Sequence, residues 1–286
     1  MPHPLRGITY DLHVHSCVSD GTYSCQNLID QAVHLGLKGI SFTDHDVIDP
    51  EIGSCDDYAV SRGISFIHGV EFSTSLSNVH ILGYNLDLSD PDLVSFLGTE
   101  QQKRIEAVKK MCRRAQKRGL AVSFEEVACE TDSVRSLGRP HIASVLQKKG
   151  YVRNIYEAFE RWLKQGQPVY ASYEKYEPSF IIKKIRQWKG IPVLAHLCLV
   201  LPSLQKRVFS ECVDNGLAGL EAYYPRFSLD QSRHCLDLAS RHGLFVTGGS
   251  DFHGANKPDI LLGSAGLDDR TFEAAADVLL NNRGNG

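Results

Sequence analysis

Paired cysteine motifs, long apolar runs and a strong excess of one charge are all absent from this 286-residue sequence. Its eight cysteines include no Cys-x-x-Cys pair, which argues against a zinc finger or a disulfide framework and predicts reduced thiols. No apolar run approaches the roughly 20 residues that span a bilayer, and residues 1–5 do not resemble a signal peptide. The net charge of −3 predicts no general attraction to nucleic acid or membranes. We therefore expect a cytoplasmic protein that does not enter membranes.

Internal repeats and low-complexity linkers are also absent, and no segment points to an obligate protein partner. Hydrophobic residues make up 42% and charged residues 23% of the chain, which is ordinary for a soluble globular protein. A chain of 286 residues can form one barrel-sized domain, or a core with an insertion.

Strand-like and helix-like segments alternate at both ends of the chain. Apolar, β-branched runs predict strands over 8–15, 39–43, 64–71, 78–84, 191–196, 217–224 and 244–250. Helical spacing predicts helices over 24–37, 56–62, 178–189, 204–215, 228–242 and 269–280. Between them, residues 92–118, 124–129, 140–149 and 155–164 favour helices without strands. The pattern predicts an α/β fold with a mostly parallel sheet or barrel over 1–90 and 168–286, interrupted by a helical insertion over 91–167.

Histidine and acidic residues cluster at the ends of the strand-like runs. The clusters are Asp11-Leu12-His13-Val14-His15, Asp44-His45-Asp46, Glu71, His196 and Asp251-Phe252-His253. His13 and His15 stand two apart, so on a strand both side chains project from the same face. In a parallel barrel the strand ends form one shared face, where these residues would meet. Imidazole and carboxylate ligands without a thiolate pair favour Zn²⁺, Mn²⁺ or Fe²⁺, so we predict a polynuclear metal centre.

Each candidate also has a purely structural interpretation. Asp20, in Ser-Asp-Gly-Thr, could be a turn residue, and His80 could be a core histidine. We favour metal binding for His80, because its strand should end near the same mouth of the barrel. Grouped imidazoles favour metal binding, because they gain nothing by meeting without a cation. Cys17 and Cys198 lie near candidate ligands, but a free cysteine is more often a small buried hydrophobe. We expect Asp11 to orient a histidine rather than to bind metal.

Seven motifs, spread from residue 11 to residue 254, together resemble one family. They are Asp11-Leu12-His13-Val14-His15-Ser16, Ser19-Asp20-Gly21-Thr22, Phe42-Thr43-Asp44-His45-Asp46, Gly69-Val70-Glu71-Phe72-Ser73, His80-Ile81-Leu82-Gly83-Tyr84, Ala195-His196-Leu197 and Gly249-Ser250-Asp251-Phe252-His253-Gly254. The chain is similar to the PHP family, named for polymerase and histidinol phosphatase. The resemblance implies a distorted (β/α)7 barrel with a metal cluster at its mouth.

The resemblance also implies a ligand set and a metal content. The nine implied ligands are His13, His15, Asp20, His45, Glu71, His80, His196, Asp251 and His253. The family pattern groups His13 and His15 with Glu71 and Asp251, and it groups Asp20 with His45 and His253. It implies two or three divalent ions, with Mn²⁺ expected and Zn²⁺ or Fe²⁺ as alternatives. A bridging position between two metals would account for Glu71.

The helical insertion and its phrase Gly138-Arg139-Pro140-His141-Ile142-Ala143 resemble the subgroup that hydrolyses 3′,5′-nucleoside bisphosphates and includes ribonuclease AM-like enzymes. The implied activity is hydrolysis of the 3′-phosphate of a small nucleotide to give a 5′-nucleotide. Trimming of short 5′-phosphorylated oligonucleotides in the 5′–3′ direction would use the same chemistry. The implied attacking group is a metal-bridging water. Alternatives are a histidinol-phosphate phosphatase, and a non-catalytic or proofreading PHP module.

Basic residues of the insertion are the candidates for binding substrate phosphate. Residues 101–118 carry eight basic side chains, which could equally be the solvated face of a helix. Arg135, Arg139 and His141 lie in a loop-to-helix segment, and guanidinium groups grip phosphate in a bidentate manner, so these three are favoured. Asp46 is a candidate acid or substrate contact, and a partner or helix cap beside His45 is nearly as well supported.

Overall fold

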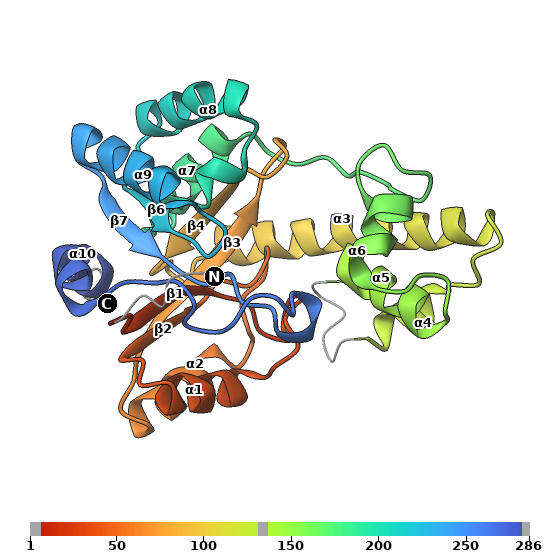
Figure 1. Ribbon diagram of the computed structural model, residues 1–286, viewed down its shortest axis with the longest axis horizontal. Helices are drawn as coiled ribbons and strands as arrows, with labels where there is room; N and C mark the ends of the chain where they lie inside the picture. The colour runs from red at the N-terminus through yellow and green to blue at the C-terminus, as the bar shows by residue number, and fades with distance from the viewer. Residues whose placement is uncertain (1–6, 131–136, 282–286) are drawn as a thin grey trace.

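The computed structural model describes residues 7–130 and 137–281 of the chain. Seven strands form one sheet in the order β1 to β7, and contacts between β1 and β7 nearly close it into a barrel (Figure 1). The strands are β1 (Tyr10–Val14), β2 (Gly39–Phe42), β3 (Ser65–Ser73), β4 (His80–Tyr84), β5 (Ile191–Leu194), β6 (Gly219–Tyr223) and β7 (Phe245–Gly248). This architecture confirms the predicted distorted seven-stranded α/β barrel.

Helices cover the outside of the barrel and form the insertion. Around the barrel are α1 (Cys25–His34), α2 (Ile52–Ser61), α7 (Pro178–Gln187), α8 (Pro202–Asp214), α9 (Leu229–His242) and α10 (Asp269–Asn281). The insertion contains α3 (Pro91–Gln116), α4 (Phe124–Ala128), α5 (Arg139–Lys148), α6 (Ile155–Ala158) and the π-helix η2 (Phe159–Leu163). Two 3-10 turns, η3 (Leu197–Leu199) and η4 (Gly254–Asn256), follow β5 and β7. No helix of the described residues has the length and apolar character to cross a membrane.

β4 runs in the opposite direction to the other strands. It pairs antiparallel with both β3 and β5, whereas every other strand pair of the barrel is parallel. The reason is the length of the β3–β4 connection, residues 74–79, because a parallel crossover needs about a dozen residues or more. The start of β4, rather than its end, therefore lies at the mouth of the barrel.

The end of the barrel opposite the mouth is closed by α10. The Phe272 ring of this helix stacks on Tyr10, at the first residue of β1, with the ring centroids 3.6 Å apart. Leu279 packs in the same buried cluster as Leu12 and Leu82 of the strands. The closed end is thus apolar, and the polar strand ends gather at the other end.

The insertion has an apolar core of its own. Val108 of α3 and Ile142 and Leu146 of α5 are fully buried in one cluster with Val169. In Figure 1 these helices form a lobe beside the barrel, and the long α3 extends from the barrel into this lobe. The predicted single helix over 155–164 is in fact α6 followed by a π-helix.

One pair of cysteines departs from the expectation of reduced thiols. Cys25 and Cys55 form a disulfide between α1 and α2, so the prediction was wrong for this pair. The two residues are 30 positions apart, and only the packing of the two helices brings them together. The other six cysteines form no disulfide in the described part of the chain, and the sulfurs of Cys198 and Cys235 lie 3.7 Å apart.

Candidate metal centre

His13 lies near the end of β1 and His15 directly follows that strand, at the mouth of the barrel. Both side chains are fully buried, and their Nε2 atoms lie 3.3 and 3.2 Å from Oε2 of Glu71. Asp251, which follows β7, places its Oδ1 3.7 Å from Nε2 of His13 and 3.3 Å from Nε2 of His15. Each of the four residues offers one ligand atom, and all four atoms lie within 4.8 Å of one another. They could hold one divalent cation.

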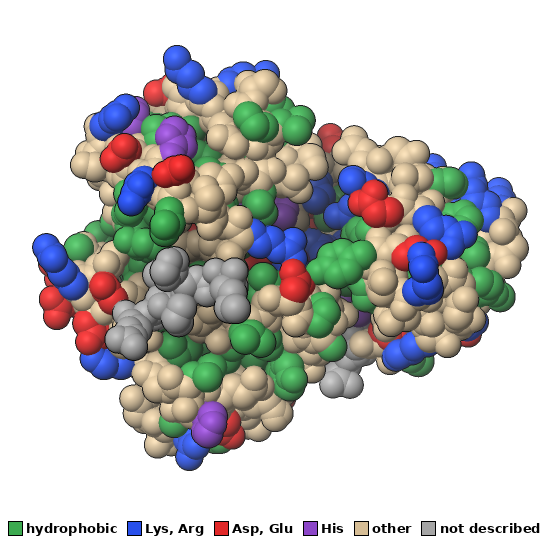
Figure 2. Space-filling model, viewed as in Figure 1, with side chains coloured by type: hydrophobic (Ala, Val, Ile, Leu, Met, Phe, Trp, Pro, Cys, Tyr) green, Lys and Arg blue, Asp and Glu red, His purple; other side chains and the backbone are tan. Residues whose placement is uncertain are grey.

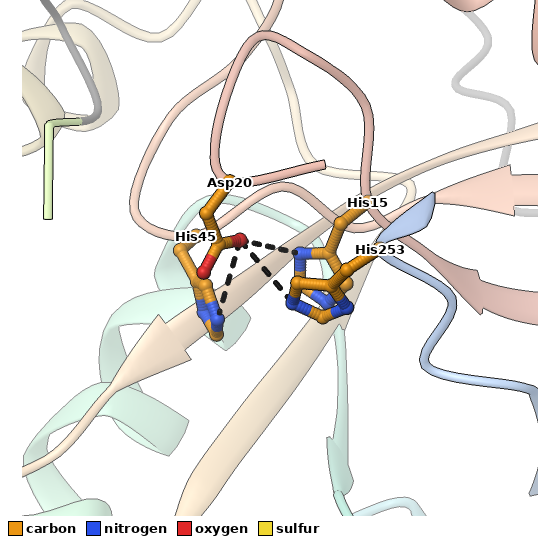
Figure 3. A group of neighbouring side chains, drawn as sticks. All are labelled: His15, Asp20, His45 and His253. Carbon is orange, nitrogen blue, oxygen red and sulfur yellow. Dashed lines mark ion pairs between the residues drawn. The ribbon is translucent and has the colours of Figure 1, made fainter. Parts of the chain in front are cut away.

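A second group forms around Asp20 (Figure 3). Its Oδ1 lies 3.2 Å from Nε2 of His253, 3.8 Å from Nδ1 of His15 and 3.9 Å from Nε2 of His45. Asp20 lies in the loop after β1, His45 follows β2 and His253 follows β7. From sequence Asp20 could have been an ordinary turn residue, but the fold turns its carboxylate toward three imidazoles.

A third group consists of His45, Glu71 and His80. We expected His80 to reach the mouth because its strand ends there, and that reasoning was wrong. His80 begins β4, and it lies at the mouth because β4 is reversed, with Nδ1 2.7 Å from Oε1 of Glu71. His196, after β5, places Nε2 3.0 Å from the same oxygen. Glu71 therefore lies among the imidazoles of all three groups, a position that suits a bridging ligand.

The buried atoms of this centre fit bound cations. Five of them have no hydrogen-bond partner among the described residues: Nε2 of His13 and His15, Nδ1 of His45 and His196, and Oε2 of Glu71. A buried polar group without a hydrogen bond costs about 1–3 kcal/mol, so several together favour a bound cation. Although burial alone would raise the pKa of Glu71, the neighbouring His80, His45 and His13 hold it well below its usual range. Charged carboxylates and imidazole nitrogens are ligands that suit borderline to hard divalent metals.

Two glycines let the ligand loops approach β1. A Cβ on Gly249 would lie 2.3 Å from Cβ of His13, and one on Gly21 would lie 2.1 Å from the carbonyl oxygen of His15. No side chain fits at such distances, so glycine is required at both positions. Gly249 stands two residues before Asp251 and Gly21 directly follows Asp20, which accounts for glycine in both motifs.

Three residues at the mouth have left-handed backbone conformations. The φ angles of Asp46, His196 and Asp251 are 52°, 28° and 54°. Such conformations cost non-glycine residues on the order of 1–3 kcal/mol and persist where the surrounding structure enforces them, often at functional sites. The fold thus uses backbone strain to aim these side chains into the mouth.

Three residues that hold the ligand side chains were missed from sequence. Glu221 of β6 is fully buried, and its Oε1 lies 2.9 Å from Nδ1 of His13. The hydroxyl of Tyr224 and the ammonium of Lys257 both donate to Oδ2 of Asp251, at 2.8 and 2.7 Å. A lone Glu in the apolar run 217–224 is a signal that could have identified Glu221, whereas Lys257 carries no local pattern.

Asp11 and Asp46 bind groups other than imidazoles. Asp11 accepts hydrogen bonds from the backbone N–H groups of Ser250 and Gly263, at 2.8 and 2.9 Å, and so ties the loop after β7 to β1. Asp46 forms an ion pair with Arg104 of α3 and accepts from the Ser73 N–H at 2.8 Å. Burial would raise the pKa of Asp46, but Arg104 and Lys175 lower it. An ionised Asp46 is suited to hold Arg104 in place.

Cationic side chains of the insertion and of the segment after it gather beside Asp46. Burial, together with repulsion from Arg104 and Arg139, lowers the pKa of Lys175 to about 8, although Asp46 opposes the shift. The Lys175 ammonium lies 5.2 Å from the centroid of the Tyr173 ring and has no ion pair among the described residues. We call Arg104, Arg139 and Lys175 the cation cluster. Neither Arg104 nor Lys175 was singled out from sequence. Arg104 was one of many basic residues with helical spacing.

The other predicted phosphate contacts have different outcomes. Nδ1 of the buried His141 accepts from the Gly138 backbone N–H at 3.1 Å, which leaves Nε2 as the nitrogen that carries the proton. The Arg139 guanidinium lies 5.6 Å from the centroid of the Phe159 ring. Arg135 lies outside the described residues.

Figure 2 shows a hollow between the barrel and the insertion, with Lys or Arg and His side chains at its base.

Comparison with known proteins gives the class of this fold and centre. The model of the PHP domain family matches residues 11–176, and the chain belongs to that family. Over 247 residues the chain is 30% identical to a 3′,5′-nucleoside bisphosphate phosphatase from Chromobacterium violaceum, covering 85% of this chain and 86% of that protein. It is 31% identical to a 5′-3′ exoribonuclease from Haemophilus influenzae, covering 85% and 89%. A solved structure from Bifidobacterium adolescentis, assigned as a metal-dependent phosphoesterase, matches with a TM-score of 0.85 and 27% identity, covering 96% of both chains.

Proposed function

We propose that this protein is a metal-dependent phosphoesterase that removes the 3′-phosphate from 3′,5′-nucleoside bisphosphates. The observation that carries the proposal is the position of the cation cluster. Arg104 of the cluster pairs with Asp46, Lys175 lies close enough to lower the pKa of Asp46, and Asp46 directly follows His45 of the candidate metal centre. Two anion-binding regions side by side suit a substrate with two phosphates. The name of the Chromobacterium violaceum relative agrees with this substrate class.

The two regions would bind different phosphates. The nine candidate ligand residues would hold the divalent cations, which would supply charge neutralisation at the 3′-phosphate and activation of water. The chain itself holds the ligand side chains at fixed positions, because Glu221, Tyr224 and Lys257 restrain His13 and Asp251. The cation cluster, with His141, would bind the 5′-phosphate. Its charge-assisted hydrogen bonds orient the nucleotide so that the 3′-phosphate meets the metal centre.

Trimming of short 5′-phosphorylated oligonucleotides is a second candidate activity. It is supported by a hollow of about 650 Å³ along α3, whose lining includes Lys103, Lys110 and Tyr173. Burial raises the pKa of Tyr173 to about 12. Arg104 and Arg139 oppose this shift, which shows that both guanidinium groups lie near the Tyr173 hydroxyl. The hollow therefore adjoins the cation cluster and offers polar and cationic groups to further nucleotides. The name of the Haemophilus influenzae relative agrees with this activity.

A phosphate-release assay tests the proposal. Manganese-loaded protein should release phosphate from adenosine 3′,5′-bisphosphate at least tenfold faster than from adenosine 3′-monophosphate, because only the bisphosphate engages the cation cluster. Equal rates would reject the role of the 5′-phosphate. Faster release from histidinol phosphate than from the bisphosphate would favour the histidinol-phosphate phosphatase alternative.

A further inference from the structure

Glu221 connects two of the candidate ligand residues through its two carboxylate oxygens. Oε1 lies 2.9 Å from Nδ1 of His13, and Oε2 accepts a hydrogen bond from the backbone N–H of His196 at 2.8 Å. The exposed fraction of Glu221 is 0%, so water does not compete for either oxygen. One side chain of β6 thereby fixes a residue of β1 and a residue that follows β5.

The contact with His13 determines which ring nitrogen can bind a cation. A carboxylate only accepts hydrogen bonds, so in a neutral imidazole the proton must lie on Nδ1. The lone pair is then on Nε2, the nitrogen that lies 3.3 Å from Oε2 of Glu71 and 3.7 Å from Oδ1 of Asp251. This Nε2 has no hydrogen-bond partner among the described residues. We propose that Glu221 is a positioning residue that sets the His13 tautomer for metal binding, an inference that rests on the proposed metal centre.

The contact with His196 adds a second constraint. The backbone of His196 has φ 28° and ψ 50°, a conformation that non-glycine residues adopt only when neighbouring contacts enforce it. The hydrogen bond from its N–H to Glu221 is such a contact. Because this N–H can only donate, Oε2 must remain an acceptor in any variant that preserves the His196 backbone.

These two constraints make a glutamine at position 221 more harmful to metal binding than an alanine. In Glu221→Gln the amide oxygen must accept from the His196 N–H, which turns the amide NH₂ toward Nδ1 of His13. The amide then donates to Nδ1, so the proton moves to Nε2 and blocks the ligand atom. Glu221→Ala removes the contact but leaves His13 free to adopt either tautomer. A merely structural role predicts the reverse order, because alanine leaves a cavity in β6 whereas glutamine has the same shape as glutamate.

The experiment measures Mn²⁺ affinity by calorimetric titration of metal-free protein, together with the midpoint of thermal unfolding before metal is added. Wild type, Glu221→Gln, Glu221→Ala and the control Glu100→Gln are compared; Glu100 is a buried carboxylate of α3 that pairs with Lys103. We expect Glu221→Gln to weaken one manganese site by roughly 10–100-fold, the range usual for partners of ligand histidines, and Glu221→Ala to weaken it less. Metal-free Glu221→Gln should unfold near the wild-type temperature, and Glu100→Gln should bind manganese as wild type does.

Equal or weaker effects of Glu221→Gln compared with Glu221→Ala would overturn the inference. Failure of the wild type itself to bind manganese would instead overturn the proposed function. A second measurement does not depend on the variants folding. Long-range ¹H–¹⁵N spectra of Zn²⁺-loaded wild type should show His13 protonated at Nδ1, and protonation at Nε2 would contradict the inference.

Discussion

The barrel mouth and the insertion present their functional side chains in different ways. At the mouth, His13, His15 and Glu71 are almost completely buried, and further side chains and backbone groups restrain them. In the cation cluster, Lys175 has no ion pair among the described residues, and Asp46 is the carboxylate that pairs with Arg104. The mouth is therefore built for fixed geometry, whereas the cation cluster carries uncompensated positive charge.

Under the proposed function, the two regions would have separate tasks. A metal centre needs ligand atoms at defined positions. The free-energy cost of burying its charged ligand groups is offset when cations bind. An anion-binding cluster needs excess positive charge, which a substrate phosphate neutralises on binding. If the assignment is right, changes at the mouth should abolish turnover of every substrate, and changes in the cluster should affect bisphosphates selectively.

The largest effect is expected for His13→Ala or Asp251→Ala. Each variant removes a candidate ligand from the group that also contains His15 and Glu71, and turnover should fall by about 1,000-fold or more for all phosphate substrates. Phosphate release and bound manganese are measured together. His234→Ala, an exposed histidine of α9, is the control and should behave as wild type. Full activity of both variants would show that phosphate hydrolysis does not take place at this group of residues.

A smaller and selective effect is expected for Lys175→Gln. Losing one charge-assisted hydrogen bond of about 1.5–3 kcal/mol should lower kcat/KM for adenosine 3′,5′-bisphosphate by roughly 10–100-fold. For adenosine 3′-monophosphate the change should stay below about threefold on the same reasoning. Lys183→Gln, at an exposed position of α7, is the matched control. If activity fell equally with both substrates, the cation cluster would not be the group that recognises the second phosphate.

The pH dependence of Lys175 gives a further test. Its pKa is lowered to about 8, so the ammonium is present below that pH and is lost as pH rises through it. The kcat/KM for the bisphosphate should therefore fall between pH 7 and pH 10 toward the level of Lys175→Gln. Lys175→Arg keeps its charge over this range, and its profile should lack this decline. An identical decline in Lys175→Arg would assign it to another group.

The smallest effect is expected at the outer face of α3. Arg113 and Lys117 are exposed, and no ion pair is found for either among the described residues. Their double replacement by Gln should change kcat/KM for the bisphosphate by less than about twofold, because exposed charges are screened by solvent and salt. A tenfold loss would show that α3 attracts substrate through its general charge rather than through the cation cluster.

The two regions also differ in how well the sequence predicts them. The positions of candidate ligands such as His15, His45 and Asp251 at the mouth were predicted because each follows a strand, and strand ends of a barrel share one face. His80 was assigned to the mouth for the wrong reason, since the direction of β4 depends on the short connection before it. The sequence did not single out Arg104 or Lys175. Only the tertiary packing of α3 against the barrel distinguishes them from ordinary solvent-exposed basic residues. The Cys25–Cys55 disulfide was missed for the same reason.

X-ray diffraction at the manganese absorption edge tests the central claim most directly. Crystals of the manganese-loaded protein should show two or three anomalous peaks at the barrel mouth. One peak should lie between His13, His15, Glu71 and Asp251, and another between His15, Asp20, His45 and His253. Absence of a peak within coordination distance of these side chains, in fully loaded crystals, would contradict the account.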